Sequence, residues 1–160
     1  GSEMCIRDRV MGVIYVPATR RLYWGEAGKG AFTAEVDADT LQPQQAQQLP
    51  LPGATQNRSF RVVASRSHLS AETQEFIDRL KAAHGEVDTV SAGSSLKLCL
   101  VAEGKADVYP RLAPTMEWDT AAGHAIARAA GCTVMQAGTT EPLHYNKENL
   151  LNPFFVVSRS

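Results

Sequence analysis

Residues 94–111, SSLKLCLVAEGKADVYPR, decide the class of fold. Read as a helix, residues 93–104 are apolar nearly all round, which is typical of a helix buried within a protein. Residues 106–111 follow as a short strand. Lysine is rarely buried, so Lys97 is the unusual residue in the middle of this helix. The stretch predicts a helix packed inside the protein and followed at once by a strand.

Strands and helices alternate on both sides of this stretch. Ser70 can cap a helix with apolar residues at helical spacing, and Gly85 suits its end. Another helix is expected to open at Glu117 and to end at Gly131. Short strands are expected over residues 60–65, 87–91, 132–136 and 154–158. This alternation predicts a layered α/β architecture without a second domain.

The first strands form a hairpin. Residues 13–16 and 21–24 are β-branched or aromatic and are joined by a short turn that begins at Pro17. Glycines follow at positions 25, 28 and 30, in a spacing that loosely resembles a phosphate-binding loop. Because a strand-like segment and no helix comes next, a second hairpin turn is the better interpretation.

Two segments are expected to lie outside the regular elements. Residues 33–57 are rich in Gln and Pro and show no amphipathic period, so they predict a surface excursion. Residues 1–10 carry charges without any period and lack the apolar segment of a signal peptide. We interpret them as an unrelated N-terminal scar or disordered end.

Composition narrows the class of protein. The chain has 160 residues and balances 16 Lys and Arg against 17 Asp and Glu, so it lacks the basic surface that a nucleic-acid binder needs. Its apolar runs are too short for a transmembrane segment. Three widely spaced cysteines without a CxxC pair indicate neither disulfides nor structural zinc, which favours a reducing, cytoplasmic setting. Cys99, within an apolar run, is expected to be buried and inert.

Asp119 is the first candidate site residue, in the segment WDTAAG at residues 118–123. One interpretation is a simple helix cap. The other is that residues 121–123 leave the first turn without bulk, so that an anion can approach the backbone N–H groups while Asp119 holds a metal ion.

Basic and polar residues make up the remaining candidates. Ser94 and Lys97 lie three residues apart, on one helix face, where they could donate to a phosphate; alternatively, Lys97 extends into solvent. Arg111 ends a strand and suits a phosphate or carboxylate, unless it is a plain surface arginine. His68 follows another strand and has either a ligand-binding or a structural role.

These segments together identify a family resemblance. Residues 94–111 and PTMEWDTAAG at 114–123, with GVIYVPA at 12–18 and VASRSH at 63–68, resemble the bacterial 3′(2′),5′-bisphosphate nucleotidases of the inositol monophosphatase-like superfamily. The resemblance covers nearly the whole chain after residue 11. The segment WDTAAG is similar to the second signature of the superfamily, and the Ser-x-x-Lys, Tyr-Pro-Arg and Ser-Arg-Ser-His elements point to the nucleotidase branch.

The resemblance implies a fold, a reaction and a set of site residues. The fold is the layered α+β fold of the sugar phosphatases, and the reaction is Mg²⁺-dependent hydrolysis of adenosine 3′,5′-bisphosphate to AMP and phosphate, which clears a by-product of sulfate assimilation. Asp119 is then a magnesium ligand, while the nucleotide and its phosphates are lined by Ser94, Lys97 and Arg111, with His68 nearby. A cytoplasmic location is implied, with peripheral contact to the bacterial inner membrane as an alternative.

One family motif is absent from the sequence. The first signature, Asp-Pro-Ile/Leu-Asp-Gly-Thr, lies before the strand that begins here at Gly12, and no Asp-Pro occurs in the chain. We therefore expect residues 11–160 to be the C-terminal part of the phosphatase domain, with the catalytic residues elsewhere. Such a chain should expose apolar surface and be inactive alone. The alternatives are an inositol monophosphatase or sugar bisphosphatase, or a non-catalytic nucleotide-binding fragment.

Overall fold

The first part of the chain forms a four-stranded antiparallel sheet in the computed structural model, which describes residues 10–65, 69–93 and 95–159. Its strands are β1 (Met11–Val16), β2 (Arg21–Glu26), β3 (Gly30–Val36) and β4 (Pro43–Leu49), in the order β1-β2-β3-β4. The short 3-10 helix η1 (Pro17–Thr19) joins β1 to β2. Gly28, with φ +77°, lies in the turn between β2 and β3, so the glycines form a hairpin and the expected hairpin turn is confirmed.

The expectation of a surface excursion over residues 33–57 was wrong for much of that segment. β3 continues to Val36, and β4 pairs with it in a register that places Leu49 opposite Ala31 and Gln48 opposite Phe32. Every side chain of β4 except Leu49 is exposed, so the segment has no apolar and polar alternation that could reveal a strand. Backbone pairing with β3 determines the conformation of β4.

The second sheet has five strands, all close to their expected positions. They are β5 (Phe60–Val63), β6 (Val87–Val90), β7 (Val108–Arg111), β8 (Cys132–Gln136) and β9 (Phe155–Arg159). The order is β6-β5-β7-β9-β8, with β5 parallel to both β6 and β7, and β9 antiparallel to β7 and β8. Helices connect the parallel strands, as such strands require.

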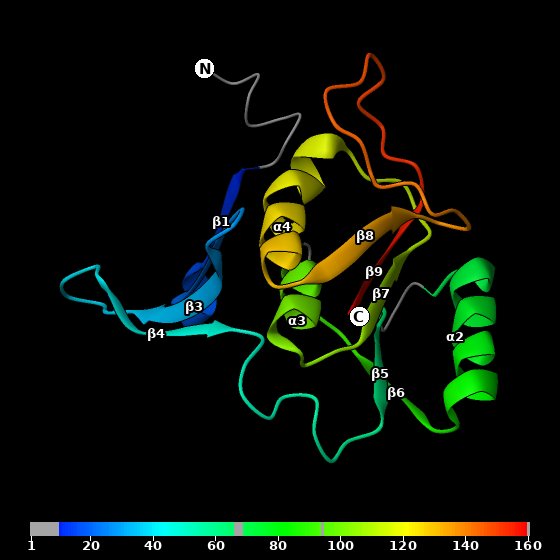
Figure 1. Cartoon of the computed structure of the whole chain (residues 1–160), viewed down its shortest axis with the longest axis horizontal. Helices are drawn as coiled ribbons and strands as arrows, with labels where there is room; N and C mark the ends of the chain where they lie inside the picture. The colour runs from blue at the N-terminus through cyan, green and yellow to red at the C-terminus, as the bar shows by residue number, and fades with distance from the viewer. Residues whose placement is uncertain (1–9, 66–68, 94, 160) are drawn as a thin grey trace.

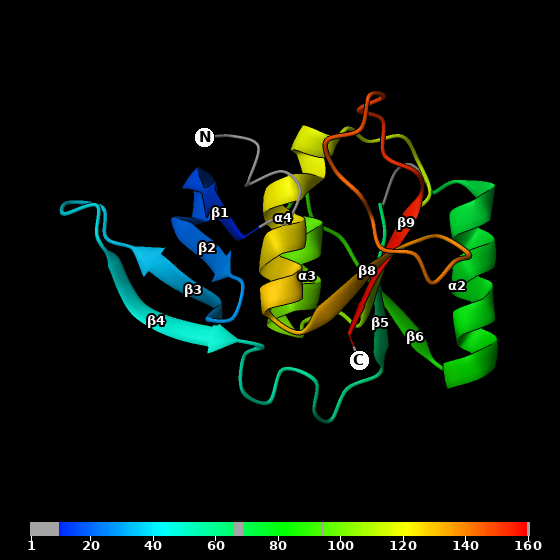
Figure 2. The same cartoon turned by 45° about the horizontal axis from the view of Figure 1, so that its top comes forward.

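Three helices complete the layers. α3 (Leu96–Glu103) and α4 (Glu117–Ala129) lie between the two sheets, and α2 (Ala71–His84) covers the outer face of the second sheet (Figures 1 and 2). The Ser70 hydroxyl caps α2 by accepting a hydrogen bond from the Thr73 backbone N–H at 3.2 Å. The chain is thus arranged as sheet, helix pair, sheet and helix, which confirms the expected layered α+β fold.

Two glycines of the first sheet let α4 lie directly on its strands. A Cβ atom at Gly12, in β1, would overlap the backbone carbonyl oxygen of Ala122, and one at Gly25, in β2, would lie 2.9 Å from the Cα atom of Ile126. Gly123 has the same role between the helices, because its Cβ would lie 3.1 Å from the Cβ atom of Leu98. Small residues therefore bring backbones close together here.

This packing corrects the interpretation of residues 121–123. The helix begins at Glu117, so these residues lie beyond its first turn, and Ala122 and Gly123 face β1 and α3. They leave room for neighbouring elements, not for an anion. Asp119 is the third residue of the helix, and Met116 occupies the cap position that we considered for Asp119.

A partly buried ion pair secures the connection between the two sheets. Arg58 donates to both carboxylate oxygens of Asp107, at 2.6 and 2.9 Å, and to the backbone oxygens of Gly104 and Ala54, at 2.7 and 2.8 Å. Burial alone would raise the pKa of Asp107, but these hydrogen bonds, another from the Arg61 N–H and the charge of Arg58 outweigh it and lower that pKa. Arg58 thereby ties the segment before β5 to the turn before β7.

The outer side of β1 exposes apolar side chains, as expected. Met11, Val13 and Tyr15 alternate along this edge strand, and each is about half exposed or more.

Within the part of the chain that the structure describes, no helix is long and apolar enough to cross a membrane.

Replacing Gly12 with alanine should destabilise the chain, because the new methyl group would overlap the Ala122 carbonyl oxygen. We expect Gly12→Ala to lower the free energy of unfolding by about 2 kcal/mol, as overpacking does. Gly93→Ala is the matched control, since a Cβ there meets no atom within 4 Å. Urea unfolding of both variants checks this; equal stability losses would contradict the close packing of α4 on β1.

Candidate functional site

A cleft of about 530 Å³ opens where α3, the end of β7 and the start of α4 meet. It lies at the carboxyl end of β7, the edge at which ligands bind in α/β sheets. Three predicted site residues, Lys97, Arg111 and Asp119, come together in its wall. The full lining consists of Ser95, Lys97, Leu98, Tyr109, Arg111, Thr115, Trp118, Asp119 and Thr120.

Lys97 lies along the cleft wall. Its Nζ atom is 5.7 Å from the centre of the Tyr109 ring, a cation–π distance, and the side chain is half-buried. Burial and the neighbouring charge of Arg111 lower the pKa of Lys97 below its usual range. The two cations therefore disfavour one another, and an anion bound between them would relieve that cost.

Arg111 lies in the wall of the same cleft. Its Nη2 donates to the Pro114 backbone oxygen at 2.9 Å. Its Nε atom is buried and, within the described residues, makes no hydrogen bond of ordinary geometry. Guanidinium groups bind carboxylates and phosphates through paired N–H donors, so Arg111 is suited to an anionic ligand.

Asp119 stabilises the helix start, as the first of the two interpretations from the sequence has it. Its Oδ2 atom accepts a hydrogen bond from the Met116 backbone N–H at 3.0 Å, so it stabilises the start of α4. Its side chain is also exposed in the cleft wall. Among the described residues, however, no group of three His, Cys, Asp or Glu side chains is placed to hold a metal ion. Asp119 alone does not make a magnesium site.

Two predicted site residues, Ser94 and His68, lie outside the described residues. Sequence reasoning missed Ser95, Tyr109, Thr115 and Thr120 as cleft residues, although all adjoin the motifs that it used. Trp118 had the clearest signal, a large aromatic residue beside Asp119; its side chain is 66% exposed.

The expected inertness of Cys99 is supported by its burial, which raises the pKa of its thiol to about 12.

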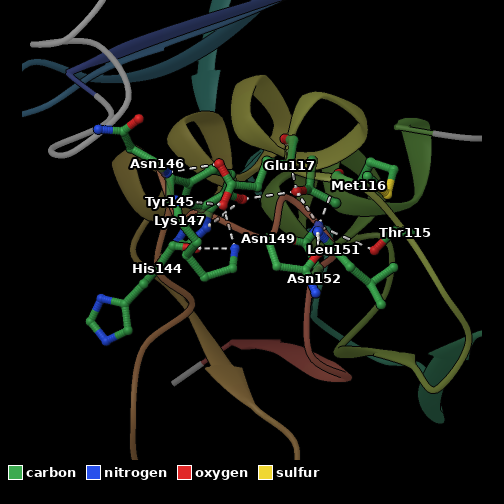
Figure 3. A network of polar contacts seen from close by, with 12 residues as sticks. Thr115, Met116, Glu117, His144, Tyr145, Asn146, Lys147, Asn149, Leu151 and Asn152 are labelled. Carbon is green, nitrogen blue, oxygen red and sulfur yellow. Dashed lines mark hydrogen bonds and ion pairs between the residues drawn. The ribbon is translucent and has the colours of Figure 1, made fainter.

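The loop at residues 143–152 holds the start of α4 through a network of polar contacts (Figure 3). The carboxylate of Glu117 accepts hydrogen bonds from the backbone N–H groups of Asn146, at 2.7 Å, and Lys147, at 3.2 Å, and pairs with the Lys147 ammonium group. Burial alone would raise the pKa of Glu117, but these donors lower it. No sequence pattern indicated this loop.

Comparisons with known proteins show which family the chain resembles. A family model described as the inositol monophosphatase family matches residues 7–154. The 3′(2′),5′-bisphosphate nucleotidase CysQ of Escherichia coli K12 is 44% identical over 150 residues, which are 93% of this chain and 54% of that protein. The chain spans about half the length of the curated relatives it matches.

Solved structures agree with the fold. The crystal structure of CysQ from Bacteroides thetaiotaomicron is 56% identical, with a TM-score of 0.83, and the match covers 94% of this chain and 58% of that one. Inositol monophosphatase-II from Staphylococcus aureus is similar at a TM-score of 0.65 over 93% of this chain and 50% of its own. At 20% identity it shows the shared fold alone.

The free energy of unfolding of the chain should depend on pH in the acid range, because Glu117 is ionised in the folded chain. A carboxylate with a lowered folded pKa contributes stability above its unfolded pKa, 4.5, and loses that contribution as pH falls through the folded pKa. We expect Glu117→Gln to lower the free energy of unfolding by about 2 kcal/mol near neutral pH, and by progressively less below about pH 4.5. Unfolding across that pH range, with the exposed Glu148→Gln as control, checks this. A pH-independent difference would contradict the ionised contact.

Proposed function

The chain belongs to the inositol monophosphatase family, and from that membership we propose that it carries the substrate-binding side of a 3′(2′),5′-bisphosphate nucleotidase. The proposed reaction is hydrolysis of adenosine 3′,5′-bisphosphate to AMP and phosphate, in the clearance of a sulfate-assimilation by-product. Relatives that are 44% and 56% identical carry the CysQ name, which favours this substrate over an inositol or sugar phosphate. We propose a cytoplasmic location, and that residues 11–160 correspond to the C-terminal part of the phosphatase domain.

The juxtaposition of Lys97 and Arg111 in one cleft is the observation that carries the proposal. The charge of Arg111 contributes to the lowered pKa of Lys97, so the pair is held at an electrostatic cost. A ligand with two phosphate groups would offset that cost with several negative charges, and a forked guanidinium would fix the orientation of one phosphate. Ser94 and His68 remain proposed contacts of the nucleotide.

Mg²⁺ is the cofactor that we propose for the whole protein, with Asp119 as one ligand. Magnesium takes six ligands, of which two or more are usually protein or phosphate oxygens. The described residues supply one carboxylate at the cleft, so they do not fit a complete site. Its other protein ligands would have to come from outside the described residues. The part that this chain plays is to bind and orient the bisphosphate.

The cations of the cleft should control nucleotide affinity. We expect adenosine 3′,5′-bisphosphate to bind the chain in isothermal titration calorimetry, and Lys97→Ala and Arg111→Ala each to raise the Kd about tenfold or more, the value of one charge-assisted hydrogen bond. Lys29→Ala is the control, since Lys29 lies in the β2–β3 turn, paired with Glu26. The absence of any binding heat for the wild-type chain would overturn the proposal.

The chain alone should show little or no phosphatase activity, because the described residues place a single carboxylate at the cleft, too few for the metal ions of the reaction. The measurement is phosphate release from adenosine 3′,5′-bisphosphate with Mg²⁺ present, and inositol monophosphate serves as the comparison substrate. Binding without release would leave a nucleotide-binding module as the activity of this chain. Rapid release from the nucleotide would show that the described residues do form a working metal site.

A further inference from the structure

We propose that Asn152 is a positioning residue for the cleft, and that it acts by fixing the start of α4. It is 4% exposed and belongs to the network of polar contacts between residues 144–152 and the start of α4 (Figure 3). The two N–H groups of its Nδ2 atom have three acceptors within hydrogen-bond distance, namely the backbone oxygen of Met116 at 2.9 Å, the hydroxyl of Thr120 at 3.0 Å and the hydroxyl of Thr115 at 3.2 Å. The Asn152 backbone N–H also donates to the Thr115 backbone oxygen, at 2.9 Å. One residue thus contacts both sides of the helix start.

These contacts lead directly to the cleft residues. Thr115 and Thr120 belong to the cleft lining. Met116, whose carbonyl group Asn152 holds, donates its own N–H to the carboxylate of Asp119. The orientation of Asp119 therefore depends on a backbone that Asn152 fixes. Asn152 touches the groups that shape the cleft, and it is not itself part of the lining.

A second contact restrains the same turn. Glu117, the first residue of α4, is held by Asn146 and Lys147 from the same loop. Trp118 follows Glu117, which pairs with Lys147, and precedes Thr120, to which Asn152 donates. Its side chain is 66% exposed. Packing therefore contributes little to the orientation of Trp118, which follows the backbone of the turn.

The chemistry of Asn152 favours positioning over simple packing. Burying an amide has a desolvation cost that an apolar side chain of similar size avoids. Its Oδ1 atom is buried and makes no hydrogen bond within residues 10–65, 69–93 and 95–159, so part of that cost is not recovered. The Nδ2 donors, in contrast, all reach groups around the cleft. Directional donors at this place are what a positioning residue needs, and packing alone does not require them.

The test compares Asn152→Ala with a control that loses a buried hydrogen bond elsewhere. Thr33→Val removes a fully buried hydroxyl that donates to the Leu22 backbone oxygen in the first sheet, away from the cleft. Both variants are made with Trp24→Phe, so that Trp118 is the only tryptophan of the chain. The measurements are Trp118 fluorescence anisotropy, its quenching by acrylamide, and the Kd for adenosine 3′,5′-bisphosphate, at a temperature at which each variant is folded.

We expect Asn152→Ala to lower the anisotropy of Trp118, to increase its quenching and to raise the Kd about tenfold. Thr33→Val should lower the Tm and leave all three unchanged. If Asn152→Ala lowers only the Tm, Asn152 is structural and the inference is overturned. If Asn152→Ala does not fold, Asn152→Ser, which keeps one donor, is measured in the same way.

The Kd readout rests on the proposed function, whereas the fluorescence readouts do not. A wild-type chain that binds no nucleotide would overturn the proposed function alone. The anisotropy and quenching of Trp118 would still decide whether Asn152 fixes the start of α4.

Discussion

The close contact of α4 with the first sheet is the constraint on which the rest of the structure depends. Gly12 and Gly25 remove the side chains that would hold the helix away from β1 and β2. Because α4 lies at this depth, α3 can pack beside it through Gly123, and the second sheet can cover both helices. The start of α4 then falls beside the end of β7, and the cleft forms between them.

Two cationic side chains come together at the cleft. Lys97 and Arg111 come from different elements, and partial burial together with their mutual proximity makes their charges costly. Lys97 also makes a cation–π contact with the Tyr109 ring, and this contact offsets only part of that cost. The loop at residues 143–152 supplies neutral and charged hydrogen bonds that hold the first turn of α4 in place.

The family relationship and the residues at the cleft have to be considered together. The match covers 54% of the Escherichia coli relative and 58% of the Bacteroides thetaiotaomicron protein that carry the CysQ name. The described residues provide the cations and one carboxylate, but no group of three potential metal ligands. A phosphate-binding surface and a metal site are separable parts of a phosphatase, and the function that we propose for this chain concerns the first.

Local patterns in the sequence determined much of the fold and part of the site. The hairpin turns, the Ser70 cap of α2 and most strands follow from spacing and turn residues, which act between neighbours along the chain. The motifs also indicated Lys97, Arg111 and Asp119. Only the tertiary structure decided that β4 is a strand, that Gly123 packs against α3, and that Asn152 holds the start of α4. Each of these depends on partners distant in sequence, for which local periodicity carries no signal.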